Sequence, residues 1–229
     1  MSRRIRVGYQ SDSGFSLAEL LVAMAIFGVI MAIVMGFFAS ATRASRENAA
    51  IGTNTESASN GMNEISRILR ASTENPVINQ AIDSPAFVSA GTGNEIVTIY
   101  AYVNLSSAAE QPVKVQFSLD SNRNLIETRW AGTPITAGYW SFTSGVPTTR
   151  TLAGAVITRT GTNPYLFTYR AKDGTPIPVP TAGFTDADLR TIASIQVTIA
   201  IGATSTATTA IVTLQNTVGL PNLDIARTL

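Results

Sequence analysis

One acidic residue lies inside the most apolar part of the chain. Glu19 comes shortly after a hydrophobic segment begins at Phe15, and residues 20–39 contain no charge. An acidic residue at hydrocarbon depth costs about 2.5–3.5 kcal/mol, the insertion value for aspartate, and normally marks a partner. No arginine or lysine lies within one helical turn of Glu19. The nearest cation would be a free amine at Phe15, present only if the chain were cut there, about 6 Å away along a helix. The chemistry that this pattern predicts is ion pairing between a buried carboxylate and a terminal ammonium.

The composition of the 229 residues excludes several kinds of catalytic and metal-binding site. The chain has no histidine and no cysteine, which excludes disulfides, Cys/His zinc sites and catalytic groups built on imidazole or thiolate. Carboxylates are scattered and no phosphate-binding loop or nucleophile motif occurs, so we expect neither enzymatic activity nor a cofactor. Hydrophobic residues make up 45% and charged residues 14%, which excludes a charge-rich disordered chain. The net charge of +1 gives no overall field for nucleic acid, and the arginines of the C-terminal part are dispersed along the chain.

The apolar stretch is long enough to cross a membrane. Residues 20–39, LLVAMAIFGVIMAIVMGFFA, reach the length of about 20 apolar residues that a bilayer requires. Three arginines precede the stretch and a long polar chain follows it, which predicts that the N-terminus stays inside. Two arginines shortly after the stretch weaken this orientation without reversing it.

The residues around Glu19 carry a family resemblance. The string GFSLAELLV that begins at Gly14, with the apolar run behind it, resembles the prepilin processing signal of type IV pilins and type II secretion pseudopilins. The resemblance covers residues 14–39. It implies that a membrane peptidase cuts after Gly14 and N-methylates Phe15, and that residues 1–14 are a leader. It also implies that Glu19 neutralises the terminal amine of a neighbouring subunit during filament assembly.

Three other interpretations of this region stay open. An ordinary secretory signal peptide fits the small-x-small triplet Ala39-Ser40-Ala41 and predicts a mature start near Thr42, although its apolar part is usually only about 7–15 residues long. An uncleaved single-pass anchor leaves Glu19 unexplained. A Glu19 side chain that reaches up to the membrane interface is compatible with the pilin interpretation before assembly. The mature N-terminus distinguishes among these interpretations.

A long helix is predicted from Phe15 onward. No proline occurs between Phe15 and Ser72, and helix-forming residues dominate. Beyond the apolar stretch the pattern becomes amphipathic, so the second half of the helix is expected to pack on a head. The predicted packing side contains Ile51, Ala58, Met62, Ile65 and Leu69.

The pattern of residues 75–229 is typical of a β-rich head. The predicted strands are Glu95–Val103, Val113–Leu119, Leu125–Trp130, Tyr165–Arg170, Ser194–Ile201 and Ala207–Gln215. A turn is predicted at Lys172–Gly174, a loop at Gly202–Thr206 and a short helical turn at Asp186–Thr191. The span Gly132–Thr151 is rich in Pro, Gly and Thr, has little periodicity and is predicted to be a loop.

Two acidic patterns imitate calcium sites. Asp120-x-Asn122-x-Asn124 opens like a calcium loop but lacks the later glycine and glutamate that such a loop needs, so a turn is preferred. Asp186 and Asp188 are compatible with a calcium loop of the kind that some pseudopilins use. An acidic pair at a helix start, which the helix dipole favours, is the preferred interpretation, and no metal site is predicted.

A second resemblance concerns the subtype. A Phe/Tyr strand, an Asp-Gly turn and an alternating strand pair resemble the J-type minor pseudopilins and related minor pilins. The pair closes with Leu214-Gln215-Asn216, where those proteins often have Leu-Arg-Asn. The stretch Met62–Arg70 also resembles their helix end.

These patterns predict an α+β, pilin-like fold in four parts, a long N-terminal helix whose second half packs on an antiparallel β-sheet head. Residues 1–14 are the cleaved leader peptide and residues 15–40 the transmembrane and filament-core helix. Residues 41–74 continue this helix in amphipathic form, and residues 75–229 form the β-rich head.

The resemblance implies a minor pilin or pseudopilin, a structural subunit assembled into, or priming, a type IV pilus or related filament for adhesion, motility, DNA uptake or secretion. Its implied partners are prepilin peptidase, other pilin subunits, an assembly platform protein and an ATPase. It implies a single pass through the cytoplasmic (inner) membrane, head outside, followed by a cell-surface or periplasmic filament. Direct nucleic-acid binding is not predicted. The alternative is a secreted or membrane-anchored β-domain enzyme or binding protein with an ordinary signal peptide and a pocket of converging polar groups.

Overall fold

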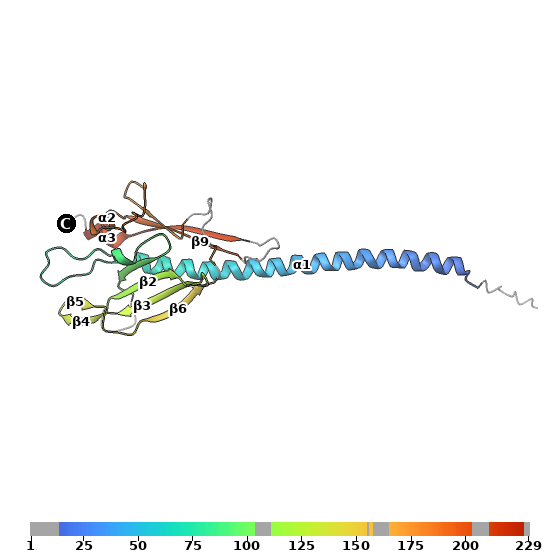
Figure 1. The fold of residues 1–229 in the computed structure, drawn as a ribbon, viewed down its shortest axis with the longest axis horizontal. Helices are drawn as coiled ribbons and strands as arrows, with labels where there is room; N and C mark the ends of the chain where they lie inside the picture. The colour runs from blue at the N-terminus through green and yellow to red at the C-terminus, as the bar shows by residue number, and fades with distance from the viewer. Residues whose placement is uncertain (1–13, 104–110, 155, 158–164, 203–210, 227–229) are drawn as a thin grey trace, which may run out of the picture. The chain divides into compact units, whose positions relative to one another are not determined.

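A computed structural model describes residues 14–103, 111–154, 156–157, 165–202 and 211–226 of the chain. The chain divides into two compact units, Met1–Asn48 and Ala49–Leu229. Helix α1 (Leu17–Arg70) forms the helical part of the first unit and continues into the second (Figure 1).

In the first unit α1 is covered by nothing that the structure describes. Every residue from 14 to 48 is exposed except Thr42, which is half-buried. The Thr42 hydroxyl donates a hydrogen bond to the Phe38 carbonyl one turn earlier, at 2.9 Å. The apolar side chains of residues 14–48 therefore have no protein partner among the described residues of this unit.

In the second unit α1 buries a stripe at helical spacing. The buried residues are Ala58, Gly61, Met62, Ile65, Ser66, Ile68 and Leu69. The predicted packing side is confirmed at Ala58, Met62, Ile65 and Leu69. The prediction was wrong for Ile51, which is 39% exposed because the buried stripe begins only two turns later, at Ala58.

Two antiparallel four-stranded sheets make up most of the head. The first has the order β1-β2-β3-β6 and consists of β1 (Val97–Ala101), β2 (Val113–Leu119), β3 (Leu125–Ala131) and β6 (Thr148–Ala153). The second has the order β10-β9-β7-β8 and consists of β7 (Phe167–Arg170), β8 (Pro176–Ile177), β9 (Ser194–Ile201) and β10 (Val212–Gly219). The remaining elements are a ribbon of β4 (Thr133–Thr136) and β5 (Tyr139–Ser141), a 3-10 turn η1 (Ser89–Gly91), and helices α2 (Asp186–Leu189) and α3 (Pro221–Ala226).

The C-terminal part of α1 packs between these two sheets (Figure 1). At Gly61 both sheets lie close to the helix backbone. A Cβ atom placed on Gly61 would lie 3.2 Å from Leu125 Cδ2 of β3 and 3.4 Å from Ile199 Cδ1 of β9. The helix therefore contributes to both interfaces, and glycine provides the space that this three-layer packing requires.

The α+β, pilin-like fold class is confirmed. Strands β2 and β9 have the predicted bounds, and the strands at 95–103, 125–130 and 165–170 are found as β1, β3 and β7 within a few residues. The last strand was placed too early: β10 runs Val212–Gly219. The start of the predicted strand and most of the predicted loop at 202–206 lie outside the described residues.

The prediction of a loop at Gly132–Thr151 was wrong. This span contains β4, β5 and most of β6. Strand β6 carries mainly exposed threonines, so it has no hydrophobic period. It forms because its backbone pairs with β3, with Arg150 opposite Glu127, and such long-range pairing leaves little trace in a local pattern.

Candidate functional site

The start of α1 is closed by two side chains that bond reciprocally. Ser16 Oγ accepts a hydrogen bond from the Glu19 N–H at 3.2 Å, and Glu19 Oε2 accepts one from the Ser16 N–H at 3.0 Å. The Ser16 hydroxyl also donates to Glu19 Oε2 at 3.1 Å. This is a capping box, which satisfies N–H groups that the first turn leaves unpaired. Sequence reasoning missed Ser16, although the spacing S-x-x-E was the signal that could have revealed it.

The capping box fixes the Glu19 carboxylate at the tip of the helix. Both of its hydrogen bonds use Oε2, and Oε1 receives none from the residues that the structure describes. Just before the box, Phe15 is 90% exposed, and a Cβ on Gly14 would meet no atom within 4 Å. The three predicted site residues, Gly14, Phe15 and Glu19, thus lie together at an uncovered helix end.

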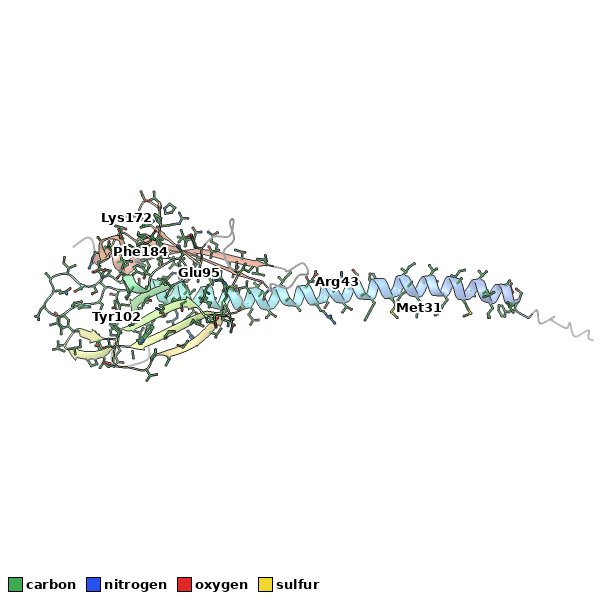
Figure 2. The ribbon with its side chains drawn as sticks, in the orientation of Figure 1. Met31, Arg43, Glu95, Tyr102, Lys172 and Phe184 are labelled. Atoms are coloured by element: carbon green, nitrogen blue, oxygen red, sulfur yellow. The ribbon has the colours of Figure 1, made fainter. Side chains whose placement is uncertain are left out.

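A continuous apolar surface follows this tip. The exposed large side chains are Phe15, Leu17, Leu20, Leu21, Val22, Met24, Ile26, Phe27, Val29, Ile30, Met31, Ile33, Val34, Met35, Phe37 and Phe38. Figure 2 shows side chains standing off α1, with Met31 labelled in this region and Arg43 beyond it. By length and composition α1 could cross a membrane, a test that a signal sequence also passes, and none of its most apolar window is buried. This surface suits hydrocarbon or other helices as its environment.

In the second unit, folding gathers three arginines that are dispersed in the sequence. Glu64 Oε1 of α1 accepts from Arg67 at 2.7 Å, and from Arg129 and Arg150 at 2.6 Å each. The carboxylate of Glu127 on β3, which is fully buried, pairs with Arg129 and, at 2.5 Å, with Arg150. This ion network ties α1 to β3 and β6.

The ion pair between Glu64 and Arg67 favours the charged form of both side chains. The hydrogen bond from Arg67, with the charges of Arg150 and Arg129, holds the pKa of Glu64 below its usual value although partial burial opposes this. The bond to Glu64 raises the pKa of Arg67 in turn.

The two candidate calcium patterns form local caps and turns. Asp120 Oδ1 accepts from the N–H groups of Asn122 and Asn124, both at 2.8 Å, so the predicted turn is confirmed. Asp188 forms a capping box with Thr185 at the start of α2, which confirms the predicted helix start. Among the residues described, no three acidic side chains come together as a metal site would require.

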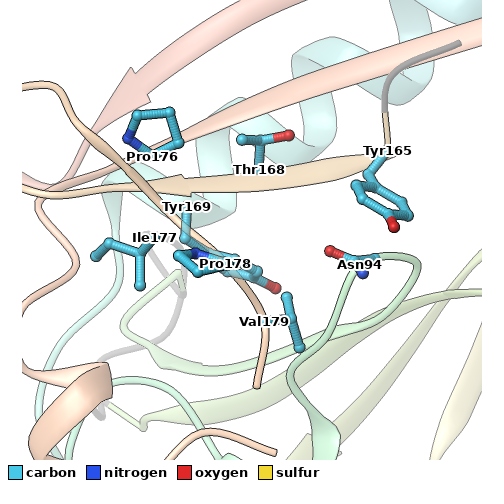
Figure 3. Close-up of a pocket in the computed structure, with 8 residues that line it drawn as sticks. All are labelled: Asn94, Tyr165, Thr168, Tyr169, Pro176, Ile177, Pro178 and Val179. Atoms are coloured by element: carbon cyan, nitrogen blue, oxygen red, sulfur yellow. The ribbon is translucent and has the colours of Figure 1, made fainter. Parts of the chain in front are cut away.

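A hollow of about 340 Å³ in the head is lined mainly by apolar and aromatic side chains (Figure 3). Its lining is Asn94, Tyr165, Thr168, Tyr169, Pro176, Ile177, Pro178 and Val179. The Tyr169 hydroxyl donates its hydrogen bond to the Gly93 carbonyl at 2.7 Å, so it is not available as a donor to a ligand. This lining carries no charged group, so it offers no acid–base pair for catalysis.

The long helix, its apolar surface and the two sheets together are typical of one class of protein. A long N-terminal helix begins at a capped glutamate, continues through an unpartnered apolar surface and ends between antiparallel sheets, as in pilin-like proteins. A family profile described as the prokaryotic N-terminal methylation motif matches residues 10–35. That motif is the prepilin signal of type IV pilins and pseudopilins, and Gly14, Phe15 and Glu19 all lie within the match.

The motif indicates a membrane-anchored structural subunit and implies processing by prepilin peptidase and assembly with other pilins. No curated protein and no solved structure matches the chain.

Proposed function

We propose that the chain is a minor pilin or pseudopilin that joins or primes a type IV pilus or a related secretion filament. Its bond after Gly14 is cut, Phe15 is N-methylated, and Glu19 pairs with the terminal ammonium of a neighbouring subunit. The observation that carries this proposal is the coincidence of the methylation motif with a capped carboxylate at the tip of an exposed apolar helix.

The ion pair gives assembly its register. A carboxylate and an ammonium that both enter hydrocarbon are individually costly and compensate each other. Because their attraction grows in a medium of low dielectric constant, only one axial offset between adjacent helices satisfies both charges. The capping box supports this role, since it aims the Glu19 carboxylate at the helix tip before a partner arrives.

The apolar surface has two successive environments in this proposal. Before assembly, residues 15–40 span the inner membrane with the head outside, and the platform protein and its ATPase then extract the helix. After assembly, the same side chains pack against helices of other subunits. Both environments remove apolar surface from water. The hydrophobic effect therefore stabilises the subunit in the membrane and in the filament.

The subtype that we propose is a J-type minor pseudopilin. In this chain the tripeptide that resembles that of the subtype, Leu214-Gln215-Asn216, lies on β10. There Asn216 Nδ2 donates a hydrogen bond to Ser66 Oγ of α1 at 3.2 Å. Gln215, which replaces the usual arginine, is exposed, so this departure leaves the bond between β10 and α1 in place.

Mass spectrometry of the N-terminal peptide from the membrane fraction tests the proposal. We expect N-methylated Phe15 as the first residue. A chain that still carries residues 1–14, or one that begins near Thr42, would contradict it, and the second result would favour the secreted β-domain. Deletion of the gene, scored together for pili, transformation and protein secretion, separates a pilus subunit from a secretion pseudopilin.

A further inference from the structure

One stripe of α1 remains uncovered between the two sheets of the head. Its exposed residues recur at helical spacing and are Glu56, Asn60, Asn63, Arg67 and Arg70. On one side lies β6, the edge strand of the first sheet, tied to the helix by the pair Arg150–Glu64. On the other lies β10, the edge strand of the second sheet, tied by Asn216 to Ser66.

Two hollows flank this stripe and share Asn63 and Arg67. The hollow on the β6 side, of about 390 Å³, is lined by Asn60, Asn63, Glu64, Arg67, Arg150, Thr151 and Leu152. The hollow on the β10 side, of about 430 Å³, is lined by Asn63, Ser66, Arg67, Arg70, Ala71 and Asn216. We call these two linings together the polar trough.

The charge of the polar trough is positive. Its lining contains Arg67, Arg70 and Arg150 against the single carboxylate of Glu64. The side chains of Arg67 and Arg150 are still 48% and 55% exposed after pairing with Glu64. Arg70 makes no side-chain hydrogen bond to any residue that the structure describes, which leaves its guanidinium available for a carboxylate.

The β10 wall of the trough is open to strand pairing. This strand has eight residues, VTLQNTVG, and within the described chain it pairs only with β9. Edge strands are normally protected by charged residues, proline or shortness, and β10 has none of these. An extended peptide could therefore add to its free edge through main-chain hydrogen bonds.

We propose that the polar trough binds an extended acidic segment of a partner protein, which adds as a strand to β10 and places carboxylates on Arg70 and Arg67. A peptide can supply hydrogen-bond partners for the unpaired backbone N–H and C=O groups at the edge of β10. A nucleic acid would interact only with the few positive charges of the trough. This inference goes beyond filament assembly through the apolar helix, and binding in solution tests it separately from that function.

The test uses the full chain in detergent micelles and a fluorescent synthetic peptide that alternates glutamate with valine. We expect saturable binding that weakens with salt, and about tenfold weaker binding for Arg70→Gln, since a charge-assisted hydrogen bond is lost. Arg70→Lys, which keeps the charge, retains most of the affinity. Arg46→Gln, on the same helix outside the head, is the matched control and binds like the unaltered chain.

Three results would overturn the proposal. They are equal affinity for the peptide with glutamine in place of glutamate, unchanged affinity of Arg70→Gln, and binding of a thymidine oligonucleotide in preference to the acidic peptide. Thermal unfolding of each variant shows that the head is folded in the binding experiment, so a loss of affinity is not a loss of structure.

Site-specific cross-linking then locates the peptide, because the chain has no cysteine of its own. With dissolved oxygen as the oxidant, a cysteine-tagged peptide is expected to form a disulfide with Thr217→Cys on β10 in higher yield than with Lys172→Cys, an exposed turn position that serves as control. Highest yield with Thr149→Cys on β6, or equal yields at all three positions, would contradict pairing on β10.

Discussion

Arg150 of β6 and Glu64 of α1 form an ion pair of 2.6 Å between residues 86 positions apart in the chain. Arg150 also reaches Glu127, a fully buried carboxylate on the neighbouring strand. One arginine thus links an edge strand, the strand beside it and the central helix. The first sheet is held on α1 by charge as well as by its apolar core.

Removing the buried charge of this network should destabilise the head. Glu127→Gln removes the buried carboxylate between Arg129 and Arg150 and leaves Glu64 as their remaining carboxylate partner, so we expect the free energy of unfolding to fall by about 3 kcal/mol. Urea denaturation followed by circular dichroism measures this. Arg150→Gln is the comparison and should cost clearly less, because this side chain is 55% exposed and Arg129 still pairs with Glu127. Equal costs would show that the buried carboxylate has no special role.

The same network predicts an acid-sensitive head. The pKa of Glu64 is lowered on folding, chiefly by the hydrogen bond from Arg67, so Glu64 contributes stability above its unfolded pKa of about 4.5. That contribution is lost as the pH falls through the lower folded pKa. We expect Tm to decrease more steeply below pH 4.5 in the unaltered chain than in Glu64→Gln. Parallel Tm profiles for the two proteins would contradict the prediction.

The hydroxyl of Tyr169 provides a buried hydrogen bond that substitution can isolate. It donates to the Gly93 carbonyl at 2.7 Å, and burial raises the pKa of Tyr169 so that the proton stays on at ordinary pH. Tyr169→Phe keeps the ring and its edge contact with Phe184 but leaves the carbonyl unpaired, at a cost of about 1–3 kcal/mol. Denaturant unfolding checks this, with the exposed Tyr102→Phe as a near-neutral control.

At the other end of the chain, two substitutions separate the charge of Glu19 from its capping bond. Glu19→Gln keeps an acceptor for the Ser16 N–H but removes the charge, so we expect normal cleavage and loss of incorporation into filaments. Ser16→Ala removes the hydroxyl cap, which lowers the stability of the helix by about 1 kcal/mol, but it keeps the charge of Glu19. Incorporation into filaments should therefore largely persist. Immunoblots of sheared filaments and of membranes measure both steps. Normal incorporation of Glu19→Gln would rule out the proposed ion pairing.

The sequence pattern correctly predicted the elements that depend mainly on neighbouring residues in the chain. The absence of proline predicted α1, alternation predicted β2 and β9, and the gap between Phe15 and Glu19 predicted the candidate site at the helix tip. Strand β6 was missed because its exposed threonines form a strand only in partnership with β3. The ion network was missed for a related reason: Glu64, Arg129 and Arg150 lie far apart in the sequence, and only the packed sheet brings them together.

The capping box has a consequence for maturation. Both of its members lie on the helix side of the bond after Gly14, so cutting that bond breaks none of the three hydrogen bonds between Ser16 and Glu19. The peptidase would release a helix that already has its final first turn, with one new positive charge beside it. Maturation would then change the covalent end and the charge of the chain while the first helical turn keeps its hydrogen bonds, and the first-turn amide protons should exchange equally slowly before and after the cut.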